Sequence, residues 1–415
     1  MISCIEALDY RCLQYVNRQL SSFQVLVGAN ASGKSTFLDT VRFFGQLVSE
    51  GLEAAVRYRT ENLQDLLWQR HGNGFELAIE IRIREDLRKV LQSSDFKICR
   101  YEVSVGIDPP TGENGIFAEK MLLTGMDEEK PVQRQLFPFT VHKPQTILRK
   151  TGTKGTKTVI NKVLGGNDNF YDETGKGWDH AFKLGPRKSA LANLPEDETK
   201  FPVATWAKRM LNEGIDAIAL NSASMRKPSP PGQPKGFKPD GSNLPWVIEN
   251  LRKINEKEFS RWISHVQTAL PDLETIKTIE RPEDRHRYLQ VKYKNGLEVP
   301  SWGVSDGTLR LLALTLLAYA GESGKIYLVE EPENGIHPQA VESVFQSLSS
   351  TYDCQVLCAS HSPVILSLAE PKQVLCFAKT PDGATDIIRG DEHPKLRDWK
   401  RGADLGTLFA TGVLG

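Results

Sequence analysis

The chain has 415 residues, with 52 basic and 52 acidic side chains, a formal net charge of zero and a pI near 7.1. This length allows two or three domains' worth of core, and a neutral total is compatible with a local basic surface. The six cysteines form no C-x2-C pair and have no histidine cluster beside them, which argues against zinc and favours buried thiols in a reduced, intracellular setting.

The N-terminal residues 1–27 are predicted to form two strands that lead into a loop, with no signal peptide before them. We therefore expect a cytoplasmic protein. The longest apolar run, Leu309 to Ala320, contains Arg310 and Thr315 and is too short to cross a bilayer. It is typical of a buried helix, so no membrane contact is expected.

Residues 28–36 read Gly-Ala-Asn-Ala-Ser-Gly-Lys-Ser-Thr, between a short apolar strand at 23–27 and a helical pattern at 34–50. This is the strand–loop–helix context of a phosphate-binding loop. Glycines let the backbone turn its N–H groups toward phosphate oxygens, and the helix N-terminus adds a positive dipole end. Lys34 is expected to bridge the β- and γ-phosphates, and the Ser35 hydroxyl to bind Mg²⁺. The predicted ATP-binding residues are Gly28, Asn30, Gly33, Lys34, Ser35 and Thr36.

The next part of the chain alternates apolar and polar residues at 75–84, 101–107 and 120–123, which predicts antiparallel strands. From about 125 to 200 the pattern weakens. Residues 149–188 carry nine basic and four acidic side chains with interleaved aromatics. They favour either a nucleic-acid contact surface or a solvated, lysine-rich hairpin and loop.

Residues 203–213 are predicted to be helical, and the Pro/Gly-rich stretch at 227–241 is predicted to be a loop. A helical pattern covers 244–269, with breaks expected at Pro245 and Pro271. The strand pattern at 288–293 and 297–299, around Asn295-Gly296, indicates a hairpin.

Two further buried strands end in polar residues. The first, at 326–329, runs into Glu330 and Glu331. Beside a phosphate loop, Glu330 is placed to hold Mg²⁺ through water, and Glu331 to polarise the attacking water as catalytic base. The second strand, at 355–359, leads to His361, which is expected to hydrogen-bond the γ-phosphate.

Ser305-Asp306-Gly307-Thr308 stands at the start of an apolar helix. A serine and a glycine at a helix N-terminus form an anion site, which is useful here if it covers a nucleotide held by another subunit. The alternative is an ordinary helix N-cap, where serine and aspartate are favoured.

Together these motifs resemble the ABC-type ATPase heads of the RecF/SMC/OLD branch. In that resemblance 305–308 is the signature, Glu330-Glu331 the Walker B pair and His361 the switch histidine. Glu330 stands where many ABC proteins carry aspartate, and His337 where transporters carry the D-loop aspartate. Either Gln64 or Gln69 would be the Q-loop glutamine. Residues 331–338 and 359–363 are similar to the versions in this branch. Within the branch, the chain is most similar to stand-alone OLD-like ATPases of bacterial anti-phage systems.

The resemblance implies an α/β fold: an ABC ATPase head with a mixed sheet, a phosphate-loop core, an antiparallel subdomain and a globular α+β insertion. The expected domains are 1–125 (first part of the head), 126–285 (an inserted module for DNA or partner contact) and 286–415 (second part of the head). The segment after His361 is too short for the Toprim nuclease domain of OLD proteins, so no nuclease activity is expected in this chain.

The implied function is hydrolysis of ATP, with Mg²⁺, in a head-to-head homodimer or higher homo-oligomer. The expected catalytic residues are Glu331 and His361. The expected metal-binding residues are Ser35 and Glu330. Ser305 and Gly307 are expected to act on the nucleotide of the second subunit. The implied partners are DNA and a separately encoded effector, a Toprim-like nuclease or a toxin, in anti-phage defence. The alternatives are a RecF-like repair ATPase and a scaffold that binds ATP without hydrolysis; a transporter head is disfavoured.

Overall fold

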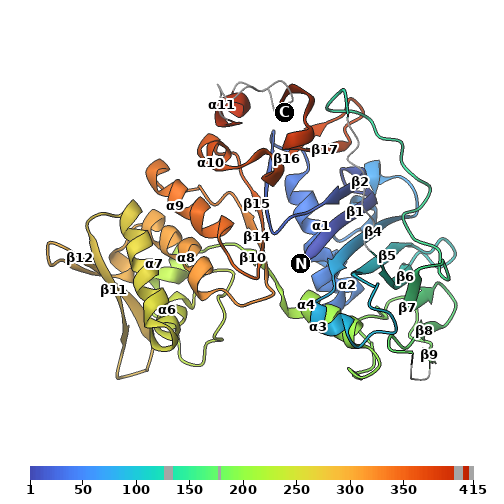
Figure 1. Cartoon of the computed structure of the whole chain (residues 1–415), viewed down its shortest axis with the longest axis horizontal. Coiled ribbons are helices and arrows are strands. Elements are labelled where there is room, and N and C mark those ends of the chain that lie inside the picture. The colour runs from blue at the N-terminus through green and yellow to red at the C-terminus, as the bar shows by residue number, and fades with distance from the viewer. Residues whose placement is uncertain (126–133, 176–178, 397–404, 411–415) are drawn as a thin grey trace. The chain divides into compact units, whose positions relative to one another are not determined.

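The computed structural model describes residues 1–125, 134–175, 179–396 and 405–410 (Figure 1). The chain divides into two compact units. The first comprises Met1–Ser21, Gly28–Ile215 and Cys376–Arg397, and the second Ser22–Val27, Asp216–Leu375 and Asp398–Gly415. The described residues of the predicted inserted module up to Ile215 thus belong to the first unit, and those from Asp216 to 285 belong to the second. The module's role as a contact region stays a prediction.

An eight-stranded antiparallel sheet in the first unit has the strand order β2-β1-β4-β5-β6-β7-β8-β9. The predicted strands at 75–84, 101–107 and 120–123 are confirmed, and β7 to β9 extend the sheet through the region of weak pattern. The strands are β1 (Ile2–Tyr10), β2 (Leu13–Gln19), β4 (Gly74–Arg82), β5 (Ile98–Ile107), β6 (Asn114–Thr124), β7 (Thr156–Val163), β8 (Asp168–Phe170) and β9 (His180–Phe182).

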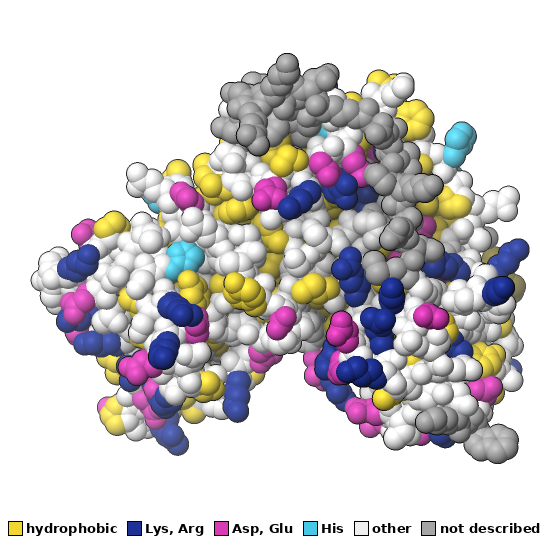
Figure 2. Space-filling view, in the orientation of Figure 1, with side chains coloured by type: hydrophobic (Ala, Val, Ile, Leu, Met, Phe, Trp, Pro, Cys, Tyr) yellow, Lys and Arg dark blue, Asp and Glu magenta, His cyan; other side chains and the backbone are white. Residues whose placement is uncertain are grey.

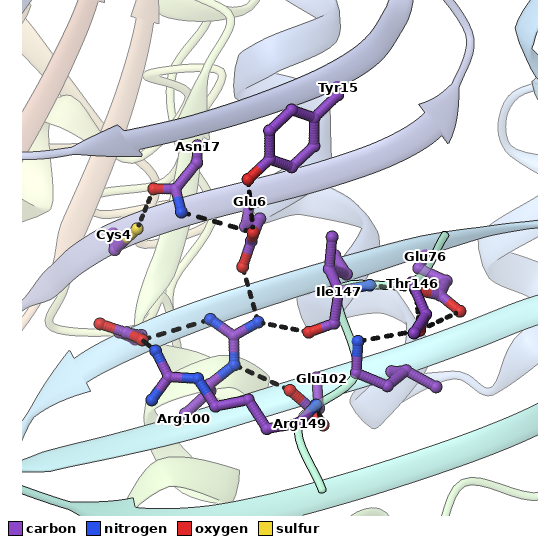
Figure 3. A network of polar contacts seen from close by, with 12 residues as sticks. Cys4, Glu6, Tyr15, Asn17, Glu76, Arg100, Glu102, Thr146, Ile147 and Arg149 are labelled. Atoms are coloured by element: carbon purple, nitrogen blue, oxygen red, sulfur yellow. Dashed lines mark hydrogen bonds and ion pairs between the residues drawn. The ribbon is translucent and has the colours of Figure 1, made fainter. Parts of the chain in front are cut away.

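One face of this sheet buries charged side chains. Figure 3 shows Arg100 of β5 between Glu6 of β1 and Glu102 of its own strand, with the backbone of Ile147 beside it. The opposite face packs on α1 (Lys34–Ser49), where the Phe43 ring lies 5.5 Å from the Phe75 ring of β4. The sheet is therefore a two-sided layer with an apolar helix side and a polar side.

A six-stranded sheet has the order β10-β14-β15-β3-β16-β17. Its strands are β10 (Ile215–Ile218), β14 (Ile326–Glu330), β15 (Gln355–Ala359), β3 (Phe23–Gly28), β16 (Val374–Lys379) and β17 (Thr385–Arg389). β14, β15 and β3 pair in parallel, and their side chains are almost all buried, as the short apolar runs predict. Residues 1–28 therefore form three strands, one more than predicted for 1–27.

The second unit also holds a small antiparallel sheet of β11 (Leu273–Glu280), β12 (Arg287–Tyr293) and β13 (Glu298–Pro300). The last two strands are the predicted hairpin, whose turn places Gly296 at φ +84°. Ion pairs cover this sheet, including Lys277 with Glu298 at 2.8 Å. Figure 2 shows basic and acidic side chains interspersed on the face that carries α6, α7 and β11.

The helices of the first unit are α1, α2 (Leu52–Arg57), α3 (Glu85–Arg88) and α4 (Pro202–Glu213). Those of the second are α5 (Ser222–Arg226), α6 (Leu244–Ile254), α7 (Glu256–Ala269), α8 (Asp306–Ala320), α9 (Pro338–Ser349), α10 (Pro363–Leu368) and α11 (Leu405–Ala410). Short 3₁₀ turns are η1 (Leu63–Leu66), η2 (Trp68–Arg70), η3 (Ser301–Gly303), η4 (Pro371–Gln373), η5 (Gly390–Glu392) and η6 (Pro394–Leu396).

The predicted break at Pro245 is wrong. Pro245 lies in the first turn of α6, where its missing N–H costs no helical hydrogen bond. The break between α6 and α7 falls instead at Asn255, whose side chain accepts a hydrogen bond from the Glu258 N–H at 3.3 Å and caps α7.

Candidate functional site

The phosphate loop follows β3 directly, and α1 begins at Lys34. Gly33 has φ +104°, and a Cβ there would lie 2.2 Å from Oγ1 of Thr385. That hydroxyl donates to the Ser32 carbonyl at 2.9 Å, so β17 holds the loop in the first unit. Gly33 is thus required by both backbone conformation and space. Thr385 is a supporting residue for which the sequence carries no local signal.

The predicted lysine is folded over its own loop. Its Nζ donates to the carbonyls of Gly28 at 2.8 Å and Ala29 at 3.0 Å, and the side chain is buried. Asn30 and Ser35 are exposed. An ammonium group over the loop backbone, next to an exposed hydroxyl in the first turn of a helix, is suited to phosphate oxygens.

The carboxyl ends of three parallel strands meet in the second unit. Glu330 of β14 is paired with Ala359 of β15, and Ala359 with Leu26 of β3. The Glu331 N–H donates to the Ala359 carbonyl at 2.8 Å. The Ser360 N–H donates to the Leu26 carbonyl at 3.1 Å. The predicted acid pair and the start of the histidine segment therefore lie side by side, at the edge where β3 runs on into the phosphate loop.

Glu331, the predicted base, has an unusual backbone. Its φ of +50° is left-handed, a conformation that non-glycine residues adopt rarely and that clusters at functional sites. Its side chain is exposed, and the Asn334 amide donates to its carboxylate. Glu330, by contrast, is half-buried at the end of β14. The two adjacent acids thus have different surroundings, and their separate roles stay a prediction.

His361 is half-buried, and its segment is anchored by a residue absent from the predicted set. Oε1 of Glu333 accepts hydrogen bonds from the His361 N–H and from the Ser360 hydroxyl, each at 2.8 Å. In the sequence, Glu333 appears only as part of the Glu-Pro-Glu-Asn run after β14. That run does not predict that the donors to Glu333 are Ser360 and His361.

The helix α8 begins as a capped helix. Ser305 is its N-cap, and its hydroxyl accepts from the Thr308 N–H at 3.2 Å. Asp306 forms an ion pair with Arg226 of α5 at 2.6 Å. A Cβ on Gly307 would lie 2.4 Å from the Gly335 carbonyl, so glycine allows the close approach of these two segments. Ser305 thus acts as an N-cap, and the action of Ser305 and Gly307 on a second subunit stays a prediction.

A protein-family model matches residues 146–367, more than half of the chain; its description is "AAA domain, putative AbiEii toxin, Type IV TA system". The chain belongs to this AAA-domain family. The matched region includes the signature, the acid pair and His361, and it begins after the phosphate loop. No curated protein matches the chain.

Among solved structures, this family member is similar to an SMC head bound to the C-terminal winged-helix domain of ScpA. The identity is 14%, the match covers 93% of this chain and 96% of the other, and the TM-score is 0.52. A second similar structure is the Smc head domain with an extended coiled coil bound to the C-terminal domain of ScpA, derived from Pyrococcus furiosus, with 14% identity, coverage of 93% and 95%, and a TM-score of 0.49. The first likeness confirms the predicted fold, a mixed α/β ABC ATPase head of the SMC type.

A fold of this ATPase type implies a divalent metal ion bound with the nucleotide. Within the described ranges there is no group of three or more His, Cys, Asp or Glu that could hold an ion. The predicted donors are a serine hydroxyl, Ser35 in the first unit, and a carboxylate, Glu330 in the second. Both are oxygen ligands of the kind that Mg²⁺ takes when water and substrate phosphates complete its shell. Each predicted donor is thus of a type that suits Mg²⁺, and the metal site itself stays a prediction.

The candidate Q-loop glutamines remain two. The Gln64 amide donates to the Arg70 carbonyl at 2.8 Å, and the Gln69 amide donates to the Asp382 carbonyl at 3.4 Å. Neither contact selects one of them.

The basic segment 149–188 proves partly structural. Lys162 is buried and paired with Asp168 across β7 and β8, and Arg149 pairs with Glu80 at 2.8 Å. Lys176 and Trp178 lie outside the described residues. A nucleic-acid contact through the remaining basic side chains stays a prediction. Within the described part of the chain, no helix has the length and apolar character needed to cross a membrane.

Proposed function

We propose that this family member is an ATPase that acts as a head-to-head dimer of two copies of the chain. The observation that carries the proposal is the edge where β14, β15 and β3 end together, with Glu330 and Glu331 on one strand end and the His361 segment on the next. A carboxylate pair beside the strand that enters a phosphate loop is suited to hydrolysis of a nucleoside triphosphate.

The chemistry assigned to these residues is a transfer of the γ-phosphoryl group to water. The backbone N–H groups of the loop and Lys34 hold the β- and γ-phosphates. Glu331 accepts the proton as water forms its bond to phosphorus and the bond to the ADP oxygen breaks. His361 donates to the γ-phosphate. Mg²⁺, held by Ser35 and Glu330, supplies charge neutralisation on the phosphates when it is bound.

The dimer follows from the signature. Ser305 and Gly307 stand at the start of α8, a helix N-terminus of the kind that can bind phosphate, in a chain whose loop at 28–36 offers another. In a symmetric pair of chains, each copy offers its helix start to the nucleotide on the other's loop. ATP binding then closes the dimer, and hydrolysis reopens it.

The test uses two site variants and one control. Lys34→Ala is expected to abolish ATP binding, and Glu331→Gln to bind ATP, lose turnover and accumulate as a dimer in size-exclusion chromatography with ATP. Lys372→Ala, which changes an exposed lysine paired with exposed Glu370, should leave ATPase activity at the wild-type level. Full turnover by Glu331→Gln would overturn the assignment. ATP binding without turnover by the wild type would instead favour the scaffold alternative.

We further propose that the ATP cycle controls a separately encoded effector, a nuclease or toxin, in anti-phage defence. Membership of a family described by a toxin–antitoxin system supports this role. The check is to purify Glu331→Gln with the products of the neighbouring genes. An ATP-dependent complex with a nuclease or toxin is expected. ATP-dependent binding to gapped DNA with no such partner would favour the RecF-like alternative.

A further inference from the structure

The segment that follows β14 connects both predicted catalytic residues. Pro332 is buried, the Asn334 N–H donates to the Glu331 carbonyl at 3.0 Å, and the Ile336 N–H donates to the Glu333 carbonyl at 3.1 Å. These contacts form a tight turn. They fix the direction in which the Glu333 side chain leaves the backbone.

That side chain reaches across to the end of β15. Its Oε1 accepts from the His361 N–H and from the Ser360 hydroxyl, both at 2.8 Å. Ser360 is fully buried, and its hydroxyl also accepts from the Ser362 N–H at 3.0 Å. Oε1 of Glu333 thus fixes the backbone around His361 in two ways: directly through the His361 N–H, and indirectly through the buried Ser360 hydroxyl.

Both of these hydrogen bonds are made to Oε1 of the Glu333 carboxylate. Oε2 is buried and has no hydrogen-bond partner within the part of the chain that the structure describes. Hydrogen bonds to an ionised acceptor are stronger than neutral ones, so a charged Oε1 is a firm anchor for two donors. An amide at this position would still offer a carbonyl to them, while its NH₂ would fall at the buried Oε2 position. Glutamine is therefore a partial substitute and alanine is none.

From this geometry we infer that Glu333 is a positioning residue for ATP hydrolysis, which sets the orientation of His361 relative to the γ-phosphate. The inference rests on the proposed function. In this role Glu333 acts through the backbone of His361. Losing a positioning contact lowers turnover, since a displacement of about 1 Å at a reacting centre costs on the order of 100-fold in rate.

The experiment is a double-mutant cycle on steady-state ATPase activity. Glu333→Ala is expected to lower kcat by roughly 10- to 100-fold, with KM for ATP changed by less than about 3-fold. Glu333→Gln should retain an intermediate kcat. In a His361→Ala background, Glu333→Ala should cost less than about 3-fold, because residues that act as a unit are not additive. Glu342→Ala, an exposed glutamate on α9, is the matched control and should keep wild-type activity.

Two results would overturn the inference. One is an unchanged kcat for Glu333→Ala. The other is that Glu333→Ala lowers kcat by the same factor in the His361→Ala background as in the wild type. The second result marks a structural role independent of the histidine. If Glu333→Ala does not fold, as judged by thermal unfolding, the same cycle is run with the near-isosteric Glu333→Gln, whose loss must also vanish in the His361→Ala background. An inactive Glu331→Gln beside an unaffected Glu333→Ala overturns only this inference, whereas full turnover by Glu331→Gln overturns the proposed function.

Discussion

Glu173 is a fully buried acid at the start of α4. It accepts hydrogen bonds from the Val203 N–H at 2.7 Å and the Ala204 N–H at 2.8 Å, two donors that the first turn of a helix leaves without helical partners. Burial raises the pKa of its carboxyl to about 7, although these two bonds act in the opposite direction. One residue therefore both caps a helix and makes the stability of the first unit depend on pH.

The sign of that dependence follows from the raised pKa. Between the ordinary carboxyl pKa and about 7 the folded state holds a proton that the unfolded chain has released, so stability falls as pH rises. From about pH 5 to about pH 8 the loss is on the order of 3 kcal/mol. Glu173→Gln should remove this component, which denaturant unfolding at both pH values checks. Glu198→Gln, an exposed control, should keep the wild-type profile. Equal pH slopes for Glu173→Gln and wild type would contradict the prediction.

At the scale of an element, the eight-stranded sheet is held by a charged cluster on its polar face. Arg100 is nearly fully buried and donates to Glu6 at 2.6 Å, to Glu102 at 2.8 Å, to Glu80 at 3.2 Å and to the Ile147 carbonyl at 2.9 Å (Figure 3). Three strands, β1, β4 and β5, thus converge on one guanidinium. Burial raises the pKa of the Glu102 carboxyl, and Arg100 opposes that rise.

Arg100→Met is expected to destabilise the protein by about 3–5 kcal/mol, because it leaves several carboxylates near one another without their cation. Denaturant unfolding measures the change. Arg84→Met is the matched control: Arg84 and its partner Asp86 are both exposed, and such pairs contribute less than about 1 kcal/mol. If both variants lose a similar amount of unfolding free energy, the buried cluster stabilises the protein no more than an exposed ion pair does.

At the scale of the whole molecule, the predicted site draws on distant parts of the chain. The phosphate loop belongs to the first unit, while the acid pair, His361 and the signature belong to the second. The match to an SMC head covers 93% of the chain, so the fold likeness includes both units. In the proposed dimer each active site takes its signature from the other copy.

That arrangement predicts complementation between two inactive variants. Lys34→Ala lacks a working loop, and Ser305→Arg lacks a working signature. A mixed dimer of the two has one intact site, made from the loop of one copy and the signature of the other. Equal mixing with free exchange should restore roughly a quarter of wild-type ATPase activity. No gain over the separate variants would contradict sharing of sites between copies.

Much of the fold could be predicted because its signals are local. The glycines of 28–36 indicate the phosphate loop. At Gly33, only glycine can adopt φ +104° and fit the space beside Thr385. The apolar runs at 326–329 and 355–359 mark buried parallel strands, and Asn295-Gly296 marks a hairpin. The prediction of a break at Pro245 is wrong because the sequence alone does not distinguish a proline that interrupts a helix from one in the first turn of a helix. The distinction depends on where the helix begins.

The sequence by itself therefore determined the fold class and marked the candidate residues of the phosphate loop, the acid pair and the histidine, since each motif depends on residues adjacent in the chain. Only the tertiary structure decided what supports them. Thr385 bonds Ser32 across 353 positions, Arg100 bonds Glu6 across 94, and Glu333 bonds His361 across 28. Such contacts leave no periodic trace, because a hydrogen bond between distant segments is fixed by how strands and helices pack and not by their order along the chain.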